Sequence, residues 1–551
     1  MEGNLTTLPV TEETIRKAEE TLLAYRAAKA PLEARLLENE QWYRLRHWST
    51  MRRNPGDPEP ASAWLLNCIA NKHADAMDNV PEPYVLPREE GDAPDAEALS
   101  AILPVVMELN EYEQVYSDVW WAKLKGGTGV TGVFWNPDGA DGLGDVDIRK
   151  VELLRLYWEP GVSRLQASRN VFHVESVPNE TLIDRWPFLR GRLNGSALTD
   201  SALPASAQTG ERSVVVDWYY KRRCGGRTVV HYAKFVCGNL LYASENDERY
   251  RLRGYYDHGL YPFVFDTQFV EPDSPAGFGY IDVCKQPQMY IDRLNQVILK
   301  GALMAARPRF FIRSDGSINE QEYADWTRDF VHFQGGSSPQ ESIRQIDVRG
   351  PDAVLVRILE GKIEELKETS GNRDFSQGSA ASGVTAAGAI MALQDAGGKL
   401  SRDMLKSSYR AFTKVCELCV ELIRQFYDEP RCFRILGEAA SIRYIRYDNA
   451  RIRPRVEDGL YRKPAFDIKI RPQRSAPMVM SARNEMAREF YKMGFFDPAN
   501  AEQALGCLEM MEFEGKPQMI ELLRRQRGAL VPAAENKGLT LRAGSDAAGM
   551  V

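Results

Sequence analysis

The chain has 551 residues, of which 44% are hydrophobic and 27% are charged, and its formal net charge at pH 7 is −7. This composition is typical of a globular protein, and the acidic balance excludes a global basic field that would recruit nucleic acid. No apolar run approaches the roughly 20 residues that span a bilayer, and the polar N-terminal stretch MEGNLTTLPVTEETIRKAEE does not resemble a signal peptide. The eight cysteines are scattered, which indicates a reducing compartment rather than a disulfide framework.

The first part of the chain is predicted to be helical and then to change to strands. Apolar residues at helical spacing predict helices over 11–48, 61–80 and 94–125, with a kink at Ala30-Pro31 and a break or kink at Pro104. Beyond Gly127 the pattern becomes that of antiparallel strands separated by turns, among them the hairpin loop DGADGLGD and the turn CGG. The predicted strand segments are 129–137, 145–153, 154–160, 170–178 and several between 213 and 244.

In the second half, two helical patterns enclose a small mixed segment. A helix is predicted over 281–306, a compact insert of strand, turn, short helix, loop and strand over 308–351, and a second helix over 352–369. A stretch rich in Gly, Ser and Ala follows, and Thr385 is a candidate N-cap for a helix that reaches Asp428 and is about 65 Å long. Strands, short helices from Met480 to Arg527 and a disordered tail after Pro532 complete the prediction, and Gly397-Gly398 predicts a kink in the long helix.

Motifs that could carry chemistry are weak in this sequence. Gly127 to Gly132 satisfies G-x-G-x-x-G, but a dinucleotide site needs a strand before it and a helix after it, and the predicted order is the reverse. Cys416 and Cys419 lie within one helix, where core packing is the expected role. The loop aspartates lack the spacing of a calcium site, no Walker A pattern occurs, and no histidine lies in a nucleophile motif. We therefore predict no catalytic residue, metal or cofactor.

Two basic clusters are predicted to be solvated surface. The first is Lys221-Arg222-Arg223 with Arg227, and the second is Arg524-Arg525 with Arg527. For the second cluster, contact with DNA or a partner is an alternative.

The helix over 352–369 is predicted to have one buried and one charged side. Leu355, Leu359, Ile363 and Leu366 recur at helical spacing, and the other faces carry Glu360, Glu364, Glu365, Lys367 and Glu368. The loop that follows cannot form a core of its own, and long loops in a large ordered protein are usually functional.

The order of these segments resembles that of portal proteins of tailed bacteriophages. The resemblance starts from GFGYIDVCKQPQMYIDRLNQVILKGAL, the insert, the second helix, the Gly/Ser/Ala loop and the long kinked helix. Upstream, GTGVTGVFWNP and DVDIRKVELLRLYWEPGV resemble the portal wing, and EMAREFYKMGFFDPANAEQALGCLEM resembles the crown. The resemblance extends to about residue 527 and implies an α+β portal fold. The implied parts are wing 1–280, stem helix 281–307, clip 308–351, stem helix 352–369, tunnel loop 370–384, long wing helix with wing strands 385–472, crown helices 473–529 and a disordered tail 530–551.

The function that this resemblance implies is that of a non-enzymatic ring, typically of twelve subunits, at one vertex of the capsid. Double-stranded DNA would pass through its channel without sequence specificity during packaging and ejection. The implied partners are the terminase large subunit, the major capsid protein, the scaffold and the head-tail adaptor, with no membrane and no cofactor. The protein would be assembled in the host cytoplasm and would reside in the virion. The implied channel residues are Asn372, Arg373, Asp374, Ser376, Gln377 and Ser379 in the tunnel loop, with Glu364, Lys367 and Glu368 on the stem.

Two other classes of protein remain open at this point. One is a soluble α+β enzyme with an unrecognised active site, which would need titratable residues that converge in a pocket. The other is a different phage structural protein, such as a capsid or tail-tube subunit, which would not explain the helix–insert–helix–loop–helix order.

Overall fold

The computed structural model describes most of the chain, which divides into two compact units, 1–473 and 474–551. The described residues are 9–51, 54–193, 211–224, 226–306, 309–312, 319, 321–322, 332, 343–346, 350, 352–371, 399–436, 442–457, 460–474, 487–495, 501–510, 519–520 and 523–524.

The N-terminal part of the first unit contains four α-helices. They are α1 (Glu12–Tyr43), α2 (Trp64–Met77), α3 (Ala93–Leu109) and α4 (Tyr112–Gly126). Of the break or kink predicted at Pro104, the break is wrong, because α3 continues through this residue. The break lies instead at Glu111, whose φ of 49° is left-handed. Asn110 explains the position, since its amide nitrogen donates to Val146 O at 3.0 Å and its Oδ1 accepts from Ile148 N at 2.8 Å.

Two antiparallel sheets form the β part of this unit. The smaller has the order β3-β2-β9, and the larger has the order β4-β5-β6-β7-β8. Their bounds are β2 (Thr128–Asn136), β3 (Asp145–Lys150), β9 (Phe263–Thr267), β4 (Leu156–Trp158), β5 (Asn170–Pro178), β6 (Arg212–Cys224), β7 (Arg227–Val236) and β8 (Asn239–Ala243). The loop between β2 and β3 and the turn between β6 and β7 are where the sequence predicts them.

The glycine motif lies at the junction of α4 and β2. Gly127 caps the helix in a left-handed conformation with φ 87°, and the strand starts at the next residue. A Cβ atom at Gly127 would lie 2.3 Å from the carbonyl carbon of Phe278, and one at Gly129 would lie 2.4 Å from Val119 O. These glycines therefore allow close backbone packing, and the prediction of a turn rather than a dinucleotide site is confirmed.

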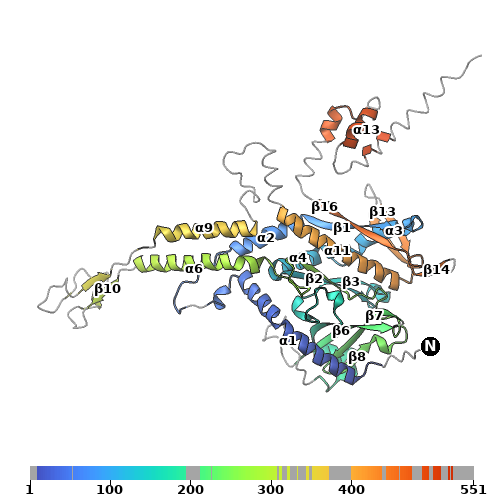
Figure 1. Ribbon diagram of the computed structural model, residues 1–551, viewed down its shortest axis with the longest axis horizontal. Coiled ribbons are helices and arrows are strands. Elements are labelled where there is room, and N and C mark those ends of the chain that lie inside the picture. Colours follow the sequence, from blue (N-terminus) through green and yellow to red (C-terminus); the bar gives the residue numbers. More distant parts are fainter. Residues whose placement is uncertain are drawn as a thin grey trace, which may run out of the picture. The chain divides into compact units, whose positions relative to one another are not determined.

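Three further helices belong to the second half of this unit. They are α6 (Tyr280–Ala306), α9 (Ala353–Ser370) and α11 (Lys399–Phe426). Figure 1 shows α6 and α9 side by side and running in opposite directions, and we refer to them as the helical pair. The predicted helical residues 385–398, with the Gly397-Gly398 kink, lie outside the described residues. Cys416 and Cys419 are buried in α11, which confirms their predicted packing role.

Smaller strand pairs complete the unit. Strand β1 (Asn79–Pro87) pairs with β16 (Phe466–Arg474), β10 (Arg309–Ile312) with β11 (Ile343–Ile346), β12 (Arg431–Leu436) with β13 (Ile442–Tyr447), and β14 (Arg455–Glu457) with β15 (Leu460–Arg462). The β10–β11 pair holds together the two ends of the predicted insert.

The main core lies where α4 and α11 pack on the smaller sheet and where α3 packs on β1 and β12. Its fully buried members include Trp120, Leu124, Phe412 and Ile423. A second core forms where α1 covers the larger sheet, and it includes Ile15, Leu22, Phe172, Val216 and Phe235. Figure 1 shows α11 and α1 against these two sheets. The start of α6 and the end of α9 lie on the side of these cores, and we refer to them as the base of the helical pair. The cores thus hold the base in place.

The second unit is described in part. Helix α13 (Ala501–Met510) contributes Ala504 and Leu508 to a small apolar cluster with Phe490 and Leu523. Helical structure here agrees with the predicted short helices.

Candidate functional site

Helix α9 carries the three predicted stem residues. Its N-cap is Asp352, whose side chain accepts from Val354 N at 3.2 Å, and its C-cap is Gly371, with φ 66°. Glu364 and Glu368 are exposed, whereas Lys367 is half-buried with its Nζ 5.8 Å from the centre of the Trp64 ring. The helix therefore has the acidic, solvated side that the sequence predicts.

The apolar stripe of α9 packs on α6 and α2. Leu366 is fully buried with Ile291 and Cys68, and Leu359 and Ile363 pack against this cluster. Leu355 of α9 is half-buried, as are Leu294 and Ile298 of α6. The stripe fixes the two helices against each other.

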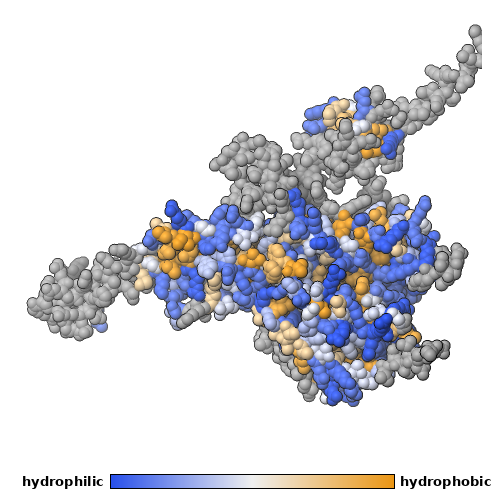
Figure 2. Space-filling view, viewed as in Figure 1, coloured by the Kyte–Doolittle hydropathy of each residue, from blue (hydrophilic) through white to orange (hydrophobic). Residues whose placement is uncertain are grey.

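A second set of apolar residues on the helical pair is exposed, and the sequence analysis did not single it out. Val297 and Leu303 of α6 are 53% and 50% exposed, and Val354, Val356 and Ile358 of α9 are 59%, 42% and 44% exposed. Figure 2 shows hydrophobic residues gathered on α9 toward its N-terminal end. Val354, Val356 and Ile358 of α9 are apolar but do not belong to the buried stripe. Apolar residues outside the stripe are the sequence signal that could have revealed this exposed set.

Helix α2 holds both ends of the segment that contains the predicted tunnel loop. Cys68 Sγ lies 3.2 Å from Ser370 Oγ at the end of α9. Lys72 Nζ donates to Ser401 Oγ at 3.0 Å, and Ser401 Oγ donates to Asp75 Oδ2 at 2.8 Å. Since these α2 residues lie within two helical turns, Ser370 and Ser401 contact the same short stretch of helix.

A buried ion pair fixes α11 at Ser408, two helical turns beyond Ser401. Lys123 Nζ lies 2.7 Å from Asp266 Oδ1 and donates to Ser408 Oγ at 2.8 Å, and Ser408 Oγ also bonds Asp266. Burial lowers the pKa of Lys123, and the carboxylate of Asp266 opposes this shift. Helices α4 and α11 and strand β9 are thus joined by one charged contact.

The base of α6 is held by another buried polar contact. His47 Nε2 lies 3.0 Å from Asp292 Oδ2, and the His47 ring stacks on Trp42 with a centroid distance of 4.2 Å. Asp292 also accepts from Ser62 N and Gln288 Nε2, each at 2.9 Å. Helix α6 is therefore anchored at its buried end and exposed at the other.

The remaining predicted site residues lie outside the described residues. They are Asn372, Arg373, Asp374, Ser376, Gln377 and Ser379. The first basic cluster is partly held by its own chain, since Arg222 Nε lies 3.1 Å from Glu245 Oε1 and Lys221 Nζ donates to Gln166 O. Of the second cluster, only Arg524 is described.

Across the described ranges, no group of three or more metal-ligating side chains occurs, and no helix is long and apolar enough to cross a membrane.

The fold places the chain among α+β proteins in which two long helices enclose a small insert. The chain matches the model of the phage P22-like portal protein family over residues 73–260 and 261–540, and it therefore belongs to this family. The predicted resemblance is confirmed, and the family is structural rather than enzymatic. No curated protein matches the chain.

Proposed function

We propose that copies of this portal protein form a ring, of twelve subunits, at one vertex of the phage capsid. The observation that carries the proposal is the exposed apolar surface of the helical pair. Exposed apolar patches on a protein surface mark interaction sites. Val354, Val356 and Ile358 are exposed on α9, where Figure 2 shows hydrophobic residues gathered, and Val297 and Leu303 are exposed on the packed helix α6. The helical pairs of neighbouring copies would cover these side chains around the ring.

The helical pair is proposed as the channel wall through which double-stranded DNA is packaged and ejected. Exposed Glu364 and Glu368 support this role, because carboxylates add no phosphate contacts that would retain a moving duplex. Residues 370–384 are proposed as the tunnel loop. The contacts of Ser370 and Ser401 with α2 support it, since they hold both ends of the loop-containing segment at the base of the pair.

The other parts are assigned on the same basis. The insert 308–351 is proposed as the clip that docks the terminase motor and later the head-tail adaptor, and the pairing of β10 with β11 supports a compact unit. Residues 1–280 and 385–472 would form the wing. Residues 473–529 would form the crown, with the major capsid protein and scaffold as further partners.

Electron microscopy of the purified full chain tests this function. Rings with a central channel, lined by α6 and α9, are the expected result. Small globular particles at every concentration would contradict the proposal of a ring.

A further inference from the structure

Strand β9 lies at the edge of the β3-β2-β9 sheet. Two hydrogen bonds establish which of its residues bond β2 and which face outward. Val133 N donates to Pro262 O at 2.9 Å, and Gln268 N donates to Gly127 O at 2.8 Å. Since hydrogen-bonded and non-bonded pairs alternate in an antiparallel ladder, Val264 and Asp266 bond β2. The N–H and C=O groups of Phe263 and Phe265 therefore point to the other side, away from β2.

The two ends of this outer edge are already occupied. The side-chain amide of Gln166 acts as a strand would, since it donates to Tyr261 O at 3.0 Å and accepts from Tyr261 N at 2.9 Å. At the other end, Ser407 Oγ donates to Thr267 O at 3.4 Å. Between them, no hydrogen bond from the described part of the chain reaches the outward backbone groups of Phe263 or Phe265. Unpaired edge groups of this kind accept a further strand.

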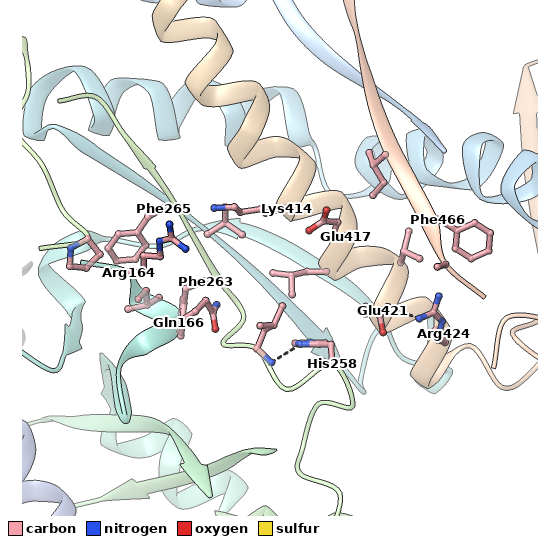
Figure 3. A pocket seen from close by; sticks show the side chains of 18 of the residues that line it. Arg164, Gln166, His258, Phe263, Phe265, Lys414, Glu417, Glu421, Arg424 and Phe466 are labelled. Carbon is pink, nitrogen blue, oxygen red and sulfur yellow. Dashed lines mark hydrogen bonds and ion pairs between the residues drawn. The ribbon is translucent and has the colours of Figure 1, made fainter. Parts of the chain in front are cut away.

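A groove of about 920 Å³ opens beside these two residues. Phe263, Phe265, Leu418 and Phe466 contribute apolar surface to it, and side chains from α11 and from the loop before β5 line its sides. Figure 3 shows Phe265 with Arg164 and Lys414 near it. The groove therefore has room for an extended chain along the edge of β9.

The charges of the groove favour a negatively charged occupant. Arg164 and Lys414 are exposed and form no ion pair with the described residues. Glu421, by contrast, is neutralised by Arg424 at 2.5 Å and Lys463 at 2.9 Å. The remaining lining carboxyl, Glu417, is exposed and feels the positive charge of Lys414. The lining bases Arg164, Lys414, Arg424 and Lys463 still outnumber the two acids Glu417 and Glu421.

We propose that the open edge of β9 binds an extended acidic segment of a partner protein as an added strand. The N–H and C=O groups of Phe263 and Phe265 pair with the backbone of this segment, and Arg164 and Lys414 bind its carboxylates. Backbone pairing supplies affinity in this mode of recognition, and the side chains at alternate positions supply specificity. The inference does not depend on the ring proposed above.

The test uses the full chain and a fluorescein-labelled peptide of about ten residues in which glutamate alternates with valine or threonine. Fluorescence anisotropy should show saturable binding. A peptide with lysine in place of each glutamate should bind at least about tenfold more weakly, and a peptide N-methylated at every amide should not bind, because it cannot donate to β9. Equal binding of either control peptide, or no binding of the glutamate peptide, would overturn the proposal.

Protein variants localise the binding. R164E and K414E should each weaken it by about tenfold, since a reversal replaces attraction by repulsion. R190E is the matched control, because Arg190 is an exposed arginine outside the groove lining, and it should leave binding unchanged. Binding that is insensitive to both groove reversals places the peptide elsewhere and overturns the proposal. Binding to free subunits that disappears in assembled rings would assign the edge to a neighbouring copy and would also overturn it.

Discussion

Two regions of the molecule differ in whether their side chains find partners within the same copy. One is the layered part around α4, β9 and α11, and the other is the outer half of the helical pair. In the layered part, even a fully buried lysine has its partners within the chain, as Lys123 does with Asp266 and Ser408. In the helical pair, valines and leucines that a core would cover are about half exposed. The first region is complete in one copy, whereas under the proposed function the second is completed by assembly. Four changes test this difference, in order of their expected effect on the stability of the single chain.

The largest effect is expected from K123M. The change leaves the carboxylate of Asp266 buried without its ammonium partner, and breaking a buried pair from one side costs roughly 3–5 kcal/mol. Urea unfolding of the variant, followed by tryptophan fluorescence, measures the loss. The double variant K123M/D266N should recover part of it, because the unpaired charge is gone. A loss below about 1 kcal/mol would show that this contact does not hold α11 in place.

A pH-dependent effect is expected from Lys29 in α1. Its Nζ donates to Leu153 O and Leu156 O, and burial lowers its pKa to about 7 against the opposing charge of Glu33. Between pH 7 and about 10 the unfolded state therefore binds more protons than the folded state, so this group makes stability rise with pH. The slope is at most about 1.4 kcal/mol per pH unit.

The comparison of wild type with K29M isolates the contribution of Lys29 to the pH dependence of stability. The cysteines and tyrosines titrate in both proteins, so their contributions cancel in the difference. The difference between the two unfolding free energies should grow in favour of wild type from pH 7 to 9. A difference independent of pH would contradict the account.

A small effect on the single chain and a large effect on assembly are expected from V356D. Val356 is an exposed residue of the helical pair, so an aspartate there should change the unfolding free energy by about 0.5 kcal/mol or less. In a ring the same charge would be buried between copies, which is costly. Size-exclusion chromatography with light scattering should show loss of rings. V270D is the matched control, since Val270 is 79% exposed outside the pair; rings that persist in V356D would disprove the interface.

No effect on stability or assembly is expected from R373A. Under the tunnel-loop proposal, Arg373 and Gln377 reach the phosphates of passing DNA, and Asp374 opposes adhesion. The variant should form normal rings and should package or retain DNA poorly, measured as nuclease-protected DNA per particle. Wild-type packaging would favour an exposed linker instead of a channel collar.

The sequence predicts the helical pair well because the relevant signals are local. Apolar spacing predicts the bounds of α6 and α9 to within about one residue. Asp352 caps the start of α9 and Gly371 caps its end. The strands from β2 to β8 are likewise marked by alternation and turns. The placement of Glu364 and Glu368 on a solvated face of α9 follows from the same periodicity.

What the sequence misses depends on partners that are distant in the chain. The break at Glu111 is set by the bonds of Asn110 to β3, and the proline that predicted a break elsewhere is tolerated within α3. Lys123 and Asp266 are 143 positions apart, so no local pattern reveals their pairing. The open edge of β9 depends on the strand order of the sheet, which periodicity alone does not give.

The most direct test of the central claim, a DNA channel closed by a collar of residues 370–384, is a crosslink at Ser376. In a background with C432S, which removes the exposed cysteine, S376C is crosslinked between neighbouring copies in assembled rings. The rings are then supplied to packaging reactions, with reduced S376C rings as the control. The account predicts that crosslinked rings block DNA passage and that reduction restores it. Normal packaging through rings shown to be crosslinked at this position would contradict the account.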